Sequence, residues 1–244
     1  IGAVSIGSIM GAGMANDLDM DTAMQTGRHA LVKVKPFSDF TLPVVSLVRG
    51  KRMEKILGET FDQNIEDLPI PYFCISCKLD DGDLNVHEQG HLATALRASA
   101  SMPGIFPPAV VNRRLSVDGS VINNLPVDVM QQKPVGKVIA VDLSSQKTYE
   151  VPYPSIPSPW AVLRGQFLPF TRRHRVPRLM TTMLKSTELG TLMRVQELGQ
   201  KADLLLRPPV RKFGMTEVKA FDRMVDVTYE YALKELSRWL DKDG

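Results

Sequence analysis

The sequence predicts an α/β fold, with strands and helices alternating along one domain of 244 residues. Three observations support this prediction. Short apolar runs of strand length alternate with longer segments that have helical periodicity. Two of the apolar runs end abruptly at small residues or at a glycine turn, as strands do before a helix. Finally, 43% hydrophobic and 23% charged residues are typical of a globular chain that buries a large core.

Strands are expected where short apolar runs end in turn residues. These runs are Ile1–Val4, Pro71–Lys78, Leu84–His87, Leu115–Val117, Val138–Asp142 and Asp203–Arg207. Helices are expected where the hydrophobic period is longer. These segments are Ile6–Asn16, Lys51–Thr60, Gly90–Ala100, Val127–Gln132, Leu179–Leu198 and Lys219–Leu240. The prolines of Val151–Pro159 predict an extended loop, because proline removes a backbone donor and blocks helix formation.

The first expected strand ends at Ser5, within the run Gly2-Ala3-Val4-Ser5-Ile6-Gly7. A sharp turn from strand to helix exposes a serine nucleophile and points the first amides of the helix at the reacting atoms. The run departs from the Gly-x-Ser-x-Gly pattern at Ala3. Because similar serine runs also occur at ordinary strand-to-helix turns, the motif alone leaves a structural interpretation open.

A second candidate is Asp118, which ends the run Leu115-Ser116-Val117 and is followed by a turn at Gly119. An Asp-Gly pair is usually only a turn, but here it complements Ser5. The histidines do not share a motif with Ser5, so the sequence offers no Ser-His-Asp triad. They are His29, His87, His91 and His174. A serine whose base is a carboxylate is therefore the sharper hypothesis.

Asp142, at the end of another expected strand, is the rival carboxylate. No glycine turn follows it, and we expect it to be a structural residue at the strand end.

The order of these motifs resembles that of the patatin-like phospholipases, and among them the branch of neuropathy target esterase and its bacterial relatives. The resemblance extends over nearly the whole chain. It depends on five ordered segments, which are Ser5–Ser8, Phe40–Gly50, Arg97–Pro108, Asp118–Pro126 and Leu204–Pro209. The resemblance implies a patatin-like three-layer α/β/α sandwich with a mainly parallel central sheet.

The resemblance also implies a serine esterase that hydrolyses carboxylic ester bonds of phospholipids or lysophospholipids. Ser5 is then the nucleophile and Asp118 the general base of a Ser-Asp dyad, and the reaction passes through an acyl-enzyme. A carboxylate within hydrogen-bond reach can accept the serine proton in the transition state. The backbone N–H of Ile6, at a helix N-terminus, is one oxyanion donor. This mechanism needs no metal ion and no cofactor.

In the family, the other oxyanion donors come from a Gly-rich loop before the nucleophile strand. The sequence starts at Ile1 and contains no such loop before Ser5. We therefore expect residues 1–244 to form a patatin-like catalytic domain without its N-terminal strand and oxyanion loop. Such a chain is expected to be weakly active or inactive, since one lost donor costs about a hundredfold to a thousandfold in rate. The alternative is a catalytically impaired patatin-like module that binds lipids or partners.

The segment from Arg164 to Lys212 is the most basic, with eleven Lys or Arg against three acidic residues. Apolar residues beside a basic cluster are typical of surfaces that contact anionic lipid headgroups. The expected membrane contacts are Trp160, Phe167, Phe170, Arg172, Arg173 and Arg175. A solvated basic face is the competing interpretation. Nucleic acid is not an expected partner, because no nucleic-acid-binding motif accompanies the charge.

The remaining motifs predict no further site. Cys74 and Cys77 form a C-x-x-C in an expected strand, which sends them to opposite faces, and no other zinc ligands lie nearby. Two structural thiols fit a reducing compartment, so the expected localisation is cytoplasmic or peripheral to a membrane. A nucleotide-binding domain is disfavoured, because the glycines between Ser8 and Gly13 lack the P-loop lysine and the Gly-x-Gly-x-x-Gly spacing.

Overall fold

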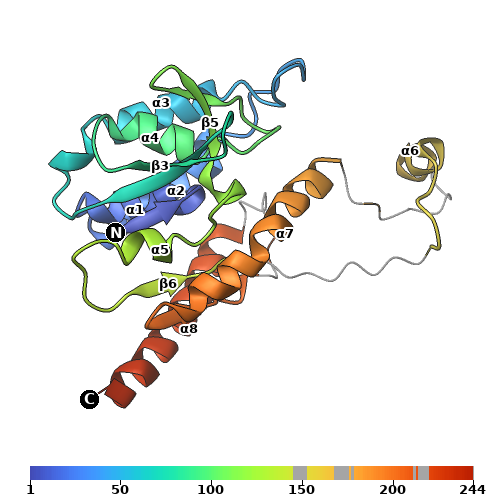
Figure 1. Ribbon diagram of the computed structural model, residues 1–244. Helices are drawn as coiled ribbons and strands as arrows, with labels where there is room; N and C mark the ends of the chain where they lie inside the picture. The colour runs from blue at the N-terminus through green and yellow to red at the C-terminus, as the bar shows by residue number, and fades with distance from the viewer. Residues whose placement is uncertain (145–152, 168–175, 177–178, 211–212, 214–219, 244) are drawn as a thin grey trace.

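The computed structural model describes residues 1–144, 153–167, 176, 179–210, 213 and 220–243 (Figure 1). Its central sheet has five strands. They are β1 (Gly2–Val4), β2 (Phe73–Lys78), β3 (Leu84–His87), β4 (Ala109–Val111) and β5 (Arg114–Asp118). A separate parallel pair consists of β6 (Ile139–Val141) and β7 (Leu204–Leu206). Helices cover the central sheet, so the predicted α/β class is confirmed.

The two faces of the central sheet pack against different helices. One face carries the largest core cluster, to which α1 (Ile6–Ala15), α3 (Lys51–Thr60) and α4 (Leu92–Ser99) contribute. On the other face, Phe73 and Ile75 of β2 pack against Val129 of α5 (Val127–Met130). Successive residues of a strand point to opposite faces, and both faces of β2 are buried. Its nearly continuous apolar sequence follows from this position.

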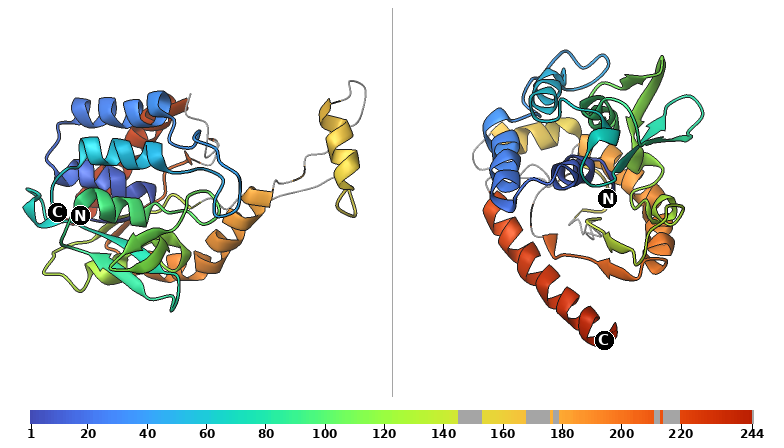
Figure 2. Two further views of the ribbon diagram at one scale, coloured as in Figure 1. Left: turned by 90° about the horizontal axis from the view of Figure 1, so that it is seen from above. Right: turned by 90° about the vertical axis from the view of Figure 1, so that its left-hand side faces the viewer.

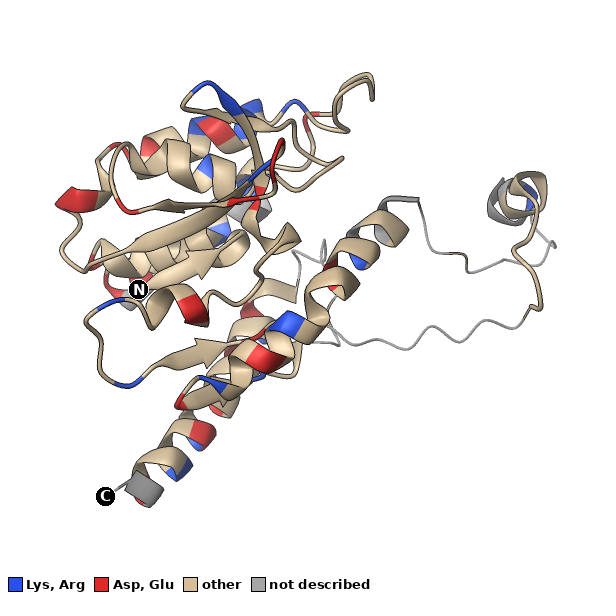
Figure 3. Cartoon of the chain, viewed as in Figure 1, with Lys and Arg blue, Asp and Glu red and all other residues tan. Residues whose placement is uncertain are grey.

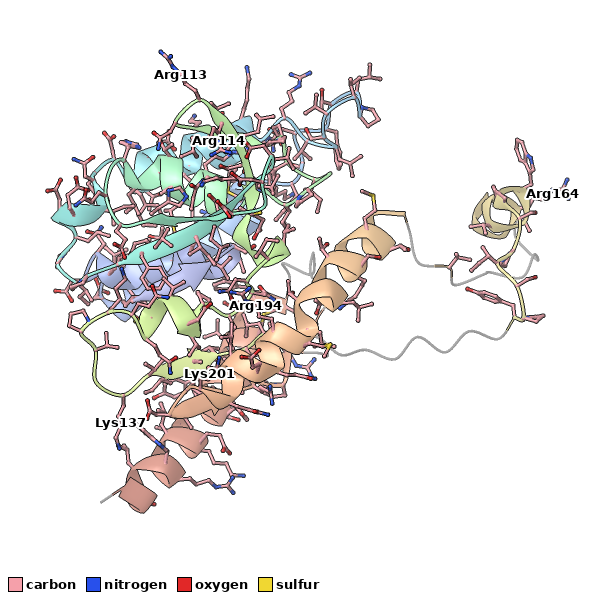
Figure 4. The ribbon with its side chains drawn as sticks, viewed as in Figure 1. Arg113, Arg114, Lys137, Arg164, Arg194 and Lys201 are labelled. Carbon is pink, nitrogen blue, oxygen red and sulfur yellow. The ribbon has the colours of Figure 1, made fainter. Side chains whose placement is uncertain are left out.

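The C-terminal part is built on long helices. The pair β6–β7 packs against α7 (Leu179–Gln200), and Leu125 and Val127 join the same apolar cluster. Arg194 of α7 forms an ion pair with Asp128 of α5 at 2.9 Å, which ties this part to the central sheet (Figure 4 labels Arg194). The helix α8 (Phe221–Asp243) contacts the end of β7, where the Tyr231 hydroxyl accepts a hydrogen bond from the Arg207 amide at 3.0 Å, and Figure 2 shows α8 and α7 on different sides of the molecule. The helix α6 (Pro159–Phe167) stands apart from the rest of the fold (Figures 1 and 2).

The central sheet is mixed instead of mainly parallel. β1 pairs with β2 in parallel, whereas β3 and β5 pair with β2, and β4 with β5, antiparallel. Short connections explain the pairs β2–β3 and β4–β5, because antiparallel neighbours need only a hairpin. β5 pairs with β2 across a longer connection that includes β3, α4 and β4. Asn112 and Arg113 join β4 to β5 with φ of 49° and 64°, as in a type I′ turn. Figure 4 shows Arg113 pointing away from the body of the fold.

The registers bring two strand ends together. β3 pairs with Cys74–Cys77 along one edge of β2, so β1 and β5 share the opposite edge. Along that edge Val4 lies opposite Ile75, and Asp118 lies opposite the next residue, Ser76. Because β1 runs parallel to β2 and β5 runs antiparallel, their carboxyl ends meet head to head. Residues that are far apart in sequence thus become neighbours at this point.

Every expected strand is present within a few residues of its predicted bounds, and the expected helices are present as well, with shorter or shifted ends. Missing from the prediction are α2 (Met20–Arg28), the π-helix His29–Val34 and β4. Asp19 caps α2 by accepting a hydrogen bond from the Thr22 amide at 2.9 Å, which is a signal the sequence contained. The expected loop at residues 151–159 ends in α6, because proline is tolerated at the first position of a helix.

Candidate active site

Ser5 occupies a strained turn between β1 and α1. Its backbone has φ 54° and ψ −132°, a conformation that residues with a Cβ rarely adopt. The turn is held from several sides, since the Ser5 amide donates to Ser99 Oγ at 3.0 Å and the Ser5 carbonyl accepts from Ser8 Oγ at 2.6 Å. Strain that the surrounding structure maintains in this way is typical of functional sites.

Asp118 ends β5 and is fully buried. Its Oδ2 accepts a hydrogen bond from Ser5 Oγ at 2.5 Å, and its Oδ1 accepts one from the Ser120 amide at 2.9 Å. Gly119 is required next to it, because a Cβ at this position would lie 2.5 Å from the Ile75 carbonyl oxygen of β2. The structure therefore brings the two predicted site residues together across 113 positions of sequence, as the motifs suggested.

The electrostatics of Asp118 follow from its surroundings. Burial raises the pKa of Asp118 to about 6, and the hydrogen bonds from Ser5 and Ser120 partly oppose that shift. Both of these donors are uncharged groups, so they stabilise the carboxylate less than a cation would. The carboxylate is nevertheless ionised at neutral pH and can accept a proton from the serine hydroxyl that it contacts.

The third predicted site group is the backbone N–H of Ile6. Ile6 is the first residue of α1, directly after Ser5. The first amides of a helix have no acceptor within the helix, and they lie at the positive end of its dipole. This position suits a donor for negative charge that develops next to Ser5.

Three residues that position the site were missed at the sequence level. Ser99, fully buried at the end of α4, accepts from the Ser5 amide, and the Ser101 carbonyl accepts from the Asp118 amide at 3.0 Å. The Tyr72 hydroxyl donates to the Ser8 carbonyl at 2.7 Å. Ser99 and Ser101 lie in the segment Arg97–Pro108 that carried the family resemblance, which was the available signal.

Arg97 holds this segment in place. Its guanidinium donates to Ser101 Oγ at 2.6 Å and to the Pro107 carbonyl at 3.1 Å, and it lies over the Phe106 ring. Glu54 of α3 completes its surroundings with an ion pair at 3.4 Å. The segment that contacts both Ser5 and Asp118 is thus fixed by a buried cation.

The other candidates have structural partners. Asp142 accepts from Arg207 Nε at 3.1 Å and from Ser144 Oγ at 2.5 Å, which confirms it as a structural residue at a strand end. Cys74 and Cys77 are buried free thiols on β2.

The described histidines occupy other positions in the fold. His87 hydrogen bonds to Ser76 Oγ at 2.8 Å, and burial lowers its pKa to about 4. His91 precedes α4 and contacts Asp62 at 3.2 Å. His29 begins the π-helix, and His174 lies outside the described residues.

An apolar pocket begins at Ile6, the residue after the serine. Ile9 and Met10 of α1 line it together with Met53 and Leu57 of α3, and residues of α2 close another side. Its walls are almost entirely carbon, so it favours an aliphatic occupant.

The comparisons with known proteins identify the family. The sequence profile of the patatin-like phospholipases matches residues 1–130, and the chain belongs to that family. An uncharacterized NTE family protein of Mycobacterium tuberculosis is 33% identical over 92% of this chain and 39% of its own length. Neuropathy target esterase sws of Drosophila melanogaster is 31% identical over 95% of this chain and 17% of its own length.

A fungal relative extends the comparison. Lysophospholipase NTE1 of Debaryomyces hansenii is 30% identical over 98% of this chain and 16% of its own length. The chain therefore spans well under half of the length of these curated relatives. The match to the family profile covers both Ser5 and Asp118, since it extends over residues 1–130.

Among the described residues, no helix combines the length and the apolar character that a membrane span requires. Within the same part of the chain, no group of three or more His, Cys, Asp or Glu side chains is arranged to hold a metal ion.

Proposed function

We propose that this chain is the catalytic domain of a serine esterase that hydrolyses carboxylic ester bonds of phospholipids or lysophospholipids. The observation that carries the proposal is the 2.5 Å hydrogen bond from Ser5 Oγ to the buried Asp118 carboxylate, at the start of α1. Membership of the patatin-like phospholipases and the similarity to proteins named lysophospholipase support the choice of substrate class. The apolar pocket beside Ile6 has a lining that favours an aliphatic group, and its volume of about 70 Å³ admits a short one.

The reaction begins when Ser5 Oγ attacks the ester carbonyl carbon and its proton passes to Asp118 Oδ2. Negative charge develops on the carbonyl oxygen, where the Ile6 amide and the helix dipole stabilise it. Collapse of the intermediate expels the alcohol, which takes the proton from Asp118, and leaves an acyl-enzyme on Ser5. Water then attacks the acyl group, gives a proton to Asp118 and releases the fatty acid as Ser5 recovers its proton.

The remaining oxyanion donors form part of this proposal. The family resemblance assigns them to a Gly-rich loop before the nucleophile strand, so we propose that full activity needs a chain that carries such a loop before Ile1. A catalytically impaired lipid-binding module, the alternative, leaves the hydrogen-bonded Ser5–Asp118 pair without a role.

Membrane contact is a second part of the proposal. Trp160 on α6 is 73% exposed, and Phe167 ends the same helix. The other expected contacts, Phe170, Arg172, Arg173 and Arg175, lie outside the described residues. If these arginines meet anionic headgroups, replacing all three by serine should weaken vesicle binding by about 1 kcal/mol per charge at low salt.

The test of the proposed hydrolysis uses a chain that includes the upstream segment. Ser5→Ala should abolish both the release of fatty acid from a lysophospholipid and the covalent labelling of the protein by a fluorophosphonate. Ser237→Ala is the matched control, because Ser237 is an exposed serine on α8 whose hydroxyl contacts only the Leu233 carbonyl of the same helix. Labelling that persists in Ser5→Ala would assign the nucleophile to another residue.

A further inference from the structure

An exposed apolar loop connects the π-helix to α3. Within six residues it presents Phe40, Leu42, Val44 and Val45, which are 70%, 77%, 79% and 67% exposed. We call residues Phe40–Val45 the apolar loop. Figure 1 shows this segment as the blue loop that projects from the upper part of the fold. Four large aliphatic or aromatic side chains exposed together are unusual on a soluble surface and mark a contact site.

The apolar loop has a defined shape. Its base is closed by a bridge between Phe40 and Val48 and by a hydrogen bond from the Thr41 amide to the Leu47 carbonyl at 3.0 Å. At the tip, the Val44 amide donates to the Leu42 carbonyl at 2.8 Å, a tight turn centred on Pro43. The backbone therefore holds the exposed side chains outward, so the loop loses little conformational entropy when it binds a surface.

The apolar loop is connected to the catalytic pair through one short segment. The Leu47 and Val48 amides donate to the carbonyls of Gly104 and Ile105, both at 3.0 Å. A few residues earlier in the same segment, Ser99 accepts from Ser5 and Ser101 accepts from Asp118. Three residues of extended chain span at most about 11 Å, so the base of the loop lies close to the site.

Basic residues surround the base of the apolar loop. From Lys33 to Lys55 the sequence has six basic and two acidic residues, and all six basic side chains are exposed. Figure 3 shows the projecting tip without charged residues and blue segments below it. Arg49 and Lys51, on either side of Gly50, follow the loop after three intervening residues. An apolar tip with a basic rim complements a surface with an apolar interior and anionic headgroups.

We propose that the apolar loop is an element, distinct from α6, through which this chain docks on an anionic lipid surface, with Leu42, Val44 and Val45 entering the acyl boundary and the basic rim meeting the headgroups. Docking by this loop presents the segment Ser99–Ile105, and with it the Ser5–Asp118 pair, to the membrane. The proposal concerns an interaction surface and does not depend on hydrolysis, so it is tested on a Ser5→Ala background.

The experiment measures sedimentation with vesicles of roughly two parts phosphatidylcholine to one part phosphatidylserine. Leu42→Ser/Val44→Ser should lower the partition coefficient at least about tenfold, since each methylene buried in the interface contributes to partitioning. Arg49→Gln/Lys51→Gln should lower it about fivefold per charge at low salt and less at high salt. Thermal unfolding of each variant verifies that the fold is retained.

Matched controls lie on α8. Leu233→Ser/Leu240→Ser removes two exposed leucines, and Arg223→Gln/Lys234→Gln removes two exposed basic residues; both should bind like the parent. Unchanged binding of a folded loop variant would overturn the proposal, as would a parent chain that ignores these vesicles. A loop variant that turns a dimer into a monomer and keeps its vesicle binding would assign the loop to a second copy of the chain. Hydrolysis of a soluble ester, measured separately with Ser5 present, reports on the proposed activity alone.

Discussion

Two carboxylates end strands in this molecule and differ in their partners. Asp118 at the end of β5 and Asp142 after β6 are both buried, at 0% and 8% exposure. Asp142 is paired with the Arg207 guanidinium, which follows β7, and with Ser144. Asp118 instead receives hydrogen bonds from a serine hydroxyl and a backbone amide. Burial is common to both, so the charge of the partner distinguishes the ion-paired carboxylate, Asp142, from the carboxylate that we propose as the general base, Asp118.

The difference in partners changes the free energy needed to ionise each carboxylate. A buried carboxylate without a cation is costly to ionise, and this cost appears as the raised pKa of Asp118. The same cost makes the group basic enough to accept a proton near neutral pH. Asp142 ties β6 to β7 through its ion pair, which is a contribution to the fold. Substituting Asp118 and Asp142 separately by asparagine tests whether the two carboxylates differ in this way.

The largest expected effect is on the rate. Asp118→Asn should lower kcat/KM about a hundredfold to ten-thousandfold, because a general base contributes that factor. Asp142→Asn should leave the rate within a few-fold of the parent. Ester hydrolysis by the chain with its upstream segment gives both values. The double variant Ser5→Ala/Asp118→Asn should be no slower than the slower single variant, since the two side chains act as one unit. If the two losses in kcat/KM multiplied in the double variant, the two side chains would act independently.

A second prediction concerns the free energy of unfolding at different pH values. The folded-state pKa of Asp118, about 6, lies above the unfolded value of 3.8, so the folded chain binds its proton more tightly. Stability from this group is present below pH 4, falls between about pH 4 and 6, and stays low above pH 6. Asp118→Asn should therefore stabilise the chain by about 3 kcal/mol at pH 8 and have little effect at pH 4. Urea unfolding at both pH values measures the difference. A destabilised variant at pH 8 would contradict the assigned cost of ionisation.

Asp142→Asn is expected to act in the opposite direction. It removes the charge that faces Arg207, whose side chain is only half-exposed, while the contact with Ser144 can remain. The expected loss is about 1–2 kcal/mol of unfolding free energy at neutral pH. Urea unfolding of Asp142→Asn and of Arg207→Gln should give similar losses, and the double variant should lose less than their sum. Additive losses would show that the ion pair does not stabilise β6–β7.

The contrast between Asp118 and Asp142 also shows which features of the fold and the site the sequence could predict. A glycine turn after Asp118, and none after Asp142, was enough to rank the two carboxylates, because only the first strand has to turn sharply beside β2. The strands and the long helices were predictable from hydrophobic period alone. Ser5 and Asp118 were found from local motifs, each of which reports on one strand end.

The remaining features depend on long-range pairing. The expected parallel sheet would gather residues at one edge, whereas Ser5 and Asp118 meet because β1 and β5 abut along β2. No local pattern in the sequence predicts the register of β1 and β5 along β2. Ser99 and Tyr72 support the serine turn through contacts with residues 94 and 64 positions away. Their roles could not be derived from residue type, since a buried serine or tyrosine looks the same wherever it donates or accepts.

The smallest expected effect tests the strain at Ser5, which has no counterpart at Asp142. Ser5→Gly and Ser5→Ala both remove the hydroxyl, but alanine keeps a Cβ at φ 54° and ψ −132°. Glycine adopts that conformation readily, so Ser5→Gly should be more stable than Ser5→Ala by about 1 kcal/mol, despite the flexibility that glycine adds to the unfolded chain. Ser8, inside α1, is the matched control, where glycine should be less stable than alanine by about 1 kcal/mol. Chemical denaturation of the four variants gives both differences. If glycine is the less stable choice at both positions, the turn at Ser5 stores no strain, and its hydrogen bonds to Ser99 and from Ser8 merely accompany a relaxed backbone.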